Sequence, residues 1–189
     1  AGQLMRERDK STARLTIAIT IIFVARALVL IAALLAWRYL PTNILMPPIE
    51  RAADTMALVA LAWAFITMDD PAILRRNFMP DLIAASALGA VVAGFVGTYY
   101  YWFFAASRGQ LFNGQWLDYA WSGAQILVAV VGLFWMLFRI RYAYDPFLKG
   151  IMLIFLGTAA GIQIVQPVLG DVAAAVRIGQ IIVMPMLAA

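Results

Sequence analysis

The sequence of 189 residues contains no cysteine and no histidine. The chain therefore cannot form disulfides, bind zinc or haem through imidazole, or use histidine as an acid–base catalyst. A glycine-rich phosphate loop, a nucleophile elbow and a paired-carboxylate site are missing from its sequence as well. We therefore predict a protein that is not an enzyme and that holds no metal or resident cofactor, although it could bind a lipid or a quinone.

Charged residues are also scarce, at 13% of the chain, whereas hydrophobic residues make up 65%. Soluble domains are about 25% charged and about 45 to 50% apolar. The charges lie in short clusters between apolar runs of about 20 residues, the length that crosses a bilayer as a helix. This pattern predicts an integral membrane protein, and the net charge of +4 does not indicate nucleic acid binding because the charges lie between spans.

Turn and charge signals divide the chain into six predicted transmembrane helices, so the fold class is an all-α membrane bundle. Residues 1–14 are predicted to be a cytoplasmic tail, and residues 15–189 a single six-span membrane domain. The last apolar run ends without a charged or aromatic anchor, which favours a natural chain that continues beyond residue 189. The predicted spans are 15–37, from just after Pro48 to 68, 81–104, 116–138, 147–166 and 172–189.

Lysine and arginine indicate the orientation. Nine of them fall in the N-terminal tail and the second and fourth connections, and only three, Arg38, Arg51 and Arg108, fall on the other side. Positive residues favour the cytoplasmic face, so both termini are predicted to be cytoplasmic. The predicted location is the bacterial inner membrane, crossed several times.

Few polar side chains lie within the predicted spans. An arginine at the bilayer centre costs about 2.5 to 3.5 kcal/mol on insertion scales, so Arg26 should face the bundle interior and meet an acceptor. At the helical rise, Arg26 lies roughly 16 Å from the outer end of its span and Asp54 roughly 9 Å, a difference that the long arginine side chain can bridge. The candidate polar site consists of Arg26, Asp54, Gln125, Gln163, Arg177 and Gln180.

Two interpretations of this site remain open. The polar residues could line a region that opens toward the outer face and binds a ligand, for which a quinone, a carotenoid or a phospholipid would be suitable. Alternatively, they could satisfy one another and fix which helices pack together, since interhelical hydrogen bonds contribute about 0.6 kcal/mol on average.

Two other sequence motifs can each be interpreted in two ways. The run TYYYWFF at residues 98–104 could stack against a ligand, but aromatic residues in a row point in different directions, which favours interface anchoring. Small residues recur at helical spacing, namely Gly89, Ala93 and Gly97 in one predicted span and Gly157 with Gly161 in another. They predict close helix packing within the bundle or against another protein.

The segments RALVLIAALLAW and LPTNILMPPIERAADTMALVALAWAF resemble the N-terminal transmembrane region of bacterial multi-sensor histidine kinases that contain GAF modules. The segment VRIGQIIVMPMLAA is similar to the last span of such regions. The resemblance implies a sensing or anchoring membrane module with a kinase core downstream. No catalytic residue carries over, because a chain without histidine has no phosphoacceptor histidine.

Three functions follow as hypotheses. The first is the sensory or anchoring transmembrane domain of a signal-transduction kinase. The second is an accessory structural subunit of a large respiratory or photosynthetic membrane complex. The third is a small transporter, which would need charges near the midplane but for which no inverted repeat is visible. The predicted partners are membrane lipids and either other membrane subunits or further copies of this chain.

Overall fold

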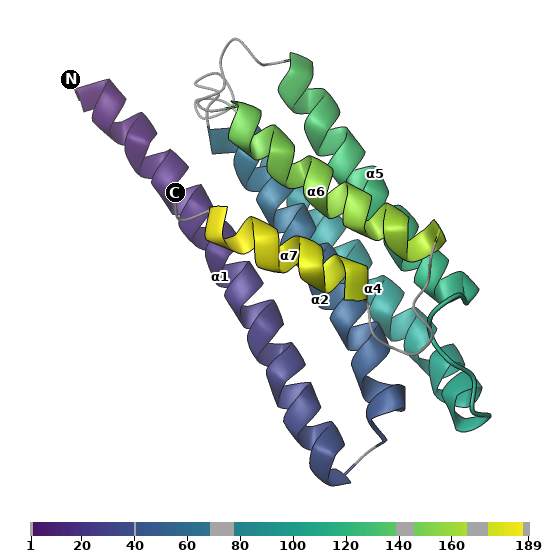
Figure 1. Ribbon diagram of the computed structural model, residues 1–189. Helices are drawn as coiled ribbons and strands as arrows, with labels where there is room; N and C mark the ends of the chain where they lie inside the picture. Colours follow the sequence, from purple (N-terminus) through teal and green to yellow (C-terminus); the bar gives the residue numbers. More distant parts are fainter. Residues whose placement is uncertain (1, 40, 69–77, 139–145, 166–173, 187–189) are drawn as a thin grey trace.

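The computed structural model describes residues 2–39, 41–68, 78–138, 146–165 and 174–186. Within these ranges the chain forms α-helices and no strands (Figure 1), which confirms the all-helical class. The helices are α1 (Gly2–Tyr39), α2 (Thr42–Met68), α4 (Met79–Ser107), α5 (Trp116–Phe138), α6 (Pro146–Val165) and α7 (Ala174–Met186).

Four stretches of the described chain are long and apolar enough to cross a membrane: Thr12–Tyr39 of α1, and the whole of α4, α5 and α6. Their outer faces carry large exposed hydrophobic side chains such as Phe23, Val96 and Phe134, which are 71%, 65% and 61% exposed. A surface of this kind is stable against hydrocarbon and not against water. The chain therefore has the properties of a membrane protein.

The helix bounds agree with the sequence prediction in some places and correct it in others. The fourth predicted span coincides with α5, and the fifth begins one residue after the start of α6, while its predicted last residue, 166, lies outside the described ranges. Helix α1, however, begins at Gly2, so most of the predicted tail continues the first helix. Arginine, glutamate and lysine are good helix formers, and no proline interrupts the chain before Pro41.

The start of α2 was also predicted wrongly. The helix begins at Thr42 and contains Pro47 and Pro48, which were expected to precede it. Pro48 has no N–H to donate to the carbonyl of Ile44, four residues earlier. The indole Nε1 of Trp102 donates to that carbonyl instead, at 3.0 Å. Trp102 is completely buried, so this residue of the aromatic run supports α2 rather than anchoring the chain at an interface.

We expect Trp102→Phe to lower the free energy of unfolding by about 1–3 kcal/mol, because the Ile44 carbonyl loses its partner. In a Pro48→Ala background the residue at 48 can donate to Ile44 itself, so the same substitution should cost less. Unfolding of the four variants in mixed detergent micelles measures this coupling. Equal costs of Trp102→Phe in both backgrounds would contradict the role given to the indole.

Helix α2 lies at the centre of the bundle and contacts α1, α4 and α5, while α6 packs on α5 and α7 packs on α6 (Figure 1). From Glu50 to Phe65, every residue of α2 except Met56 and Trp63 is buried. The apolar core around it includes Leu61 of α2, Met136 of α5 and Leu153 of α6. Polar side chains in this part of α2 therefore have to find partners inside the protein.

Small residues allow close packing at only some of the predicted positions. Among them, a Cβ at Gly157 would lie 3.1 Å from Ala129 of α5. At Gly179, which is not one of the predicted positions, a Cβ would lie 2.8 Å from Ala159 of α6. At Gly89, Gly97 and Gly161 a Cβ would meet nothing within 4 Å. The close contact at Gly179 seats α7 against α6.

The described part of α7 has 13 residues, which span roughly 20 Å at the helical rise, compared with a hydrocarbon thickness of about 30 Å. The remaining residues of the predicted sixth span, 172–173 and 187–189, lie outside the described ranges.

Candidate functional site

One stretch of α2 carries four buried polar side chains, which we call the polar turn: Glu50, Arg51, Asp54 and Thr55, with exposed fractions of 3%, 0%, 2% and 1%. Residues four apart share a face of a helix. The polar turn therefore has two faces, one formed by Glu50 and Asp54 and the other by Arg51 and Thr55.

The first face joins α2 to α1 and α7. Oδ1 of Asp54 lies 2.8 Å from Nη2 of Arg26 and accepts a hydrogen bond from Nε2 of Gln180, also at 2.8 Å. The guanidinium of Arg26 donates to Oε1 of Gln180 as well, which closes a triangle of three side chains from three helices. One turn away, Arg177 forms an ion pair with Glu50.

The second face joins α2 to α5. Arg51 approaches Oδ1 of Asp118 through Nη2 at 2.9 Å and through Nε at 3.0 Å. Its Nη2 also donates to Oδ1 of Asn113 at 2.7 Å, and the guanidinium lies 5.4 Å from the centre of the Phe112 ring. The two charged side chains are 0% and 1% exposed, so this pair is closed to the surroundings.

The same face extends to α6 and further along α5. Oδ2 of Asp118 accepts hydrogen bonds from the backbone N–H of Gly114 at 3.1 Å and from Nε2 of Gln163 at 3.4 Å. Nε2 of Gln125 donates to Oγ1 of Thr55 at 3.2 Å. The polar turn thus has partners on α1, α5 and α7 and, through Asp118, on α6.

The first face is less enclosed than the second. The side chains of Arg26 and Arg177 are 33% and 46% exposed, whereas those of Asp54 and Glu50 are 1% and 5% exposed. Each carboxylate is thus covered by the arginine that pairs with it. The guanidinium groups are the parts of this network that an outside group can reach.

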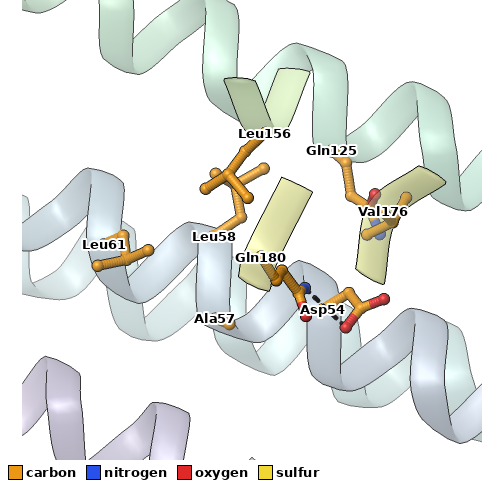
Figure 2. Close-up of a pocket in the computed structure, with 8 residues that line it drawn as sticks. All are labelled: Asp54, Ala57, Leu58, Leu61, Gln125, Leu156, Val176 and Gln180. Atoms are coloured by element: carbon orange, nitrogen blue, oxygen red, sulfur yellow. Dashed lines mark hydrogen bonds between the residues drawn. The ribbon is translucent and has the colours of Figure 1, made fainter. Parts of the chain in front are cut away.

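A small cavity lies beside Asp54 (Figure 2), bordered by α2, α5, α6 and α7. Its volume of about 10 Å³ corresponds to the space needed for one water molecule. Oδ2 of Asp54 is buried and has no hydrogen-bond partner among the described residues. A quinone, a carotenoid or a phospholipid does not fit here in this conformation. The lining residues are Asp54, Ala57, Leu58, Leu61, Gln125, Leu156, Val176 and Gln180.

The structure divides the six predicted site residues among several contacts. Arg26, Asp54 and Gln180 meet directly, and the predicted pairing of Arg26 with Asp54 is present. Gln125 borders the same cavity but donates to Thr55. Gln163 and Arg177 pair elsewhere, with Asp118 and with Glu50.

Sequence reasoning missed the Arg51–Asp118 pair. Arg51 contributes to the charge bias that predicts the topology, and the candidate polar site does not include Asp118. A usable signal was present, because both are charged residues within the first turns of apolar helices at the same predicted side of the membrane. Unpaired charges at such positions are costly, which predicts that they pair.

In the described part of the chain, these acids and arginines pair one to one: Asp54 with Arg26, Glu50 with Arg177 and Asp118 with Arg51. Such an arrangement holds helices in register and leaves two guanidinium groups partly accessible to an anionic group. Comparisons of the chain with models of protein families, with curated proteins and with solved structures find no match.

Proposed function

We propose that this chain is a non-catalytic membrane module that anchors, and transmits a signal to, a kinase of the histidine kinase class. The observation that carries the proposal is the polar turn, which links α7 to α1 and α2 through Gln180 and Arg177. The sequence resemblance to the membrane regions of multi-sensor histidine kinases supports the same class.

The polar turn suits transmission between helices. Helix α7 cannot move relative to α1 and α2 without breaking the bonds of Gln180 and the ion pair of Arg177. Broken polar contacts in a low-dielectric interior are costly, so an element held by them tends to have few discrete positions rather than a continuous range. An anionic group that competes for Arg177 or Arg26 would shift α7 away from its present position.

The function is tested by purifying the protein from its native membrane in a mild detergent. We expect kinase activity to accompany the chain, and Gln180→Leu to change the rate of autophosphorylation while leaving the amount of assembled protein unchanged. A preparation without kinase activity, or a rate that does not respond to Gln180→Leu, contradicts the proposal.

The proposal includes six membrane spans with both termini in the cytoplasm, and the absence of native cysteine makes this testable with single cysteines. The ends of α1 and α4 lie at the same end of the bundle (Figure 1). We expect Arg38→Cys and Gln110→Cys, both at exposed positions, to react with a membrane-impermeant maleimide in intact cells. Met79→Cys and Phe147→Cys, also at exposed positions, should react only after permeabilisation. Labelling of all four in intact cells would rule out this topology.

A second candidate function is that of an accessory subunit in a larger membrane complex. It is favoured by α4, which has few buried residues along its apolar stretch and which has open space beside Gly89 and Gly97. Small residues on an open helix face allow another transmembrane helix to approach closely. Recovery of the chain in fixed stoichiometry with haem or iron–sulfur subunits, without kinase activity, would favour this function over the first.

A further inference from the structure

A second, larger cavity lies away from the polar turn, in a groove between α4 and α5 with α2 as its floor. It begins at Val59, one helical turn beyond Thr55, and has a volume of about 360 Å³. Its lining is apolar except for the indole nitrogens of two tryptophans. The lining residues are Val59, Ala62, Trp63, Ile66, Pro80, Ile83, Ala84, Ala87, Leu127, Val128, Val131, Gly132 and Trp135.

The groove opens sideways. Ile83 on α4 and Leu127 and Val131 on α5 form its rim and are 67%, 63% and 54% exposed, whereas Val59 and Ala62 on the floor are buried. Both walls belong to helices that are long and apolar enough to cross a membrane. The opening therefore faces the hydrocarbon of the bilayer rather than water.

The size of the groove is that of a small-molecule site. A partner helix with its side chains is about 10 Å wide, much thicker than a single hydrocarbon chain. The volume of the groove lies within the range of about 300 to 1,000 Å³ for small-molecule sites. Small side chains, including Ala84 and Ala87 on one face of α4, create the space.

One end of the groove carries charges. Trp63 lines the groove and donates from Nε1 to Oδ1 of Asp81 at 3.0 Å. Oδ2 of Asp81 pairs with Nη2 of Arg14 at 3.0 Å, and the aspartate side chain remains 40% exposed. The two charges cancel, and the exposed carboxylate can accept further hydrogen bonds. This end suits a head group that carries both a positive and a negative charge.

We propose that the groove binds one acyl chain of a phospholipid with a zwitterionic, amine-bearing head group, whose ammonium lies beside Asp81. Indole rings favour the interface between hydrocarbon and head groups, and Trp63 lies where the proposed chain would meet its head group. The site differs from the outer polar region that the sequence suggested for lipid or quinone, and it does not depend on the proposed signalling function.

The test measures lipid retained by the purified protein. Wild-type protein washed extensively in detergent should retain about one phosphatidylethanolamine per protein molecule, as measured by native mass spectrometry. The reason is that the groove has room for only about one acyl chain. The double variant Ala84→Leu with Ala87→Leu fills the groove and should lose most of this lipid. The matched control is Ala85→Leu with Ala90→Leu on the same helix, at exposed positions that do not line the groove, and it should retain the lipid.

A second measurement covers the possibility that the filled variant folds poorly. Adding phosphatidylethanolamine at ten times its dissociation constant should raise the Tm of the delipidated wild type and of the control by about 3–6 °C, and that of the filled variant by less than half as much. Equal retention and equal Tm shifts in all three proteins would overturn the proposal. Retention of an isoprenoid quinone in place of the phospholipid would overturn it as well.

Discussion

Asp118→Leu is expected to lower the free energy of unfolding by about 3–5 kcal/mol, the usual cost of leaving a buried charge without its partner. Arg51 has no exposure to solvent, and Asn113 is the other side chain that accepts from its Nη2. The measurement is an SDS titration in mixed micelles followed by tryptophan fluorescence. Arg38→Leu, at an exposed position near the end of α1, is the control and should change the stability by no more than about 0.5 kcal/mol.

Removing both charges separates the cost of the unpaired arginine from that of lost packing. In the double variant Arg51→Met with Asp118→Leu, apolar side chains of similar length replace the pair. We expect it to recover at least half of the stability lost in Asp118→Leu, because a buried ion pair replaced by apolar residues is often neutral. Recovery will be incomplete because Asn113 and Gln163 lose their charged partner. A double variant less stable than Asp118→Leu would show that the ion pair itself is strongly stabilising.

The bounds of a helix could be predicted from the sequence wherever local polar or turn-forming residues end the helix. Residues 116–138 form a continuous apolar run between polar connections, and α5 has those bounds. The prediction failed at Pro48, because a proline in the first turns of a helix is tolerated when another group satisfies the carbonyl it leaves free. The group that does so is Trp102, 58 residues later in the chain, and no local pattern could reveal it.

The candidate site could be predicted only in part, for a similar reason. Depth along each helix was enough to match Arg26 with Asp54, since both positions follow from the helical rise. Arg177 belongs to the same predicted polar site as Asp54, but its partner is Glu50, one turn earlier on α2. Which of two acids an arginine reaches depends on how α7 crosses α2, and that angle is set by contacts such as Gly179 on Ala159. The sequence alone does not specify those contacts.

Substituting Arg26 should lower the free energy of unfolding more than substituting its partner Asp54. Arg26→Leu leaves the carboxylate of Asp54, 1% exposed, with Gln180 as its one partner among the described residues, and should cost about 3 kcal/mol or more. Asp54→Leu removes the acceptor of Arg26 and of Gln180 Nε2 but leaves Arg26 bonded to Gln180 with 33% of its side chain exposed. It should therefore cost less, about 1.5–3 kcal/mol.

The release of α7 distinguishes these two variants from a general loss of stability. Val183 on α7 is completely buried, and Val183→Cys would be the only cysteine in the chain. Added to this background, Arg26→Leu should make the cysteine react with maleimide about tenfold faster for each 1.4 kcal/mol by which it favours the open state of α7. Asp54→Leu should accelerate labelling less, and Arg38→Leu should not change it. Faster labelling with Asp54→Leu than with Arg26→Leu would contradict this explanation. It would show that an unpaired Asp54 carboxylate is not what favours the open state of α7.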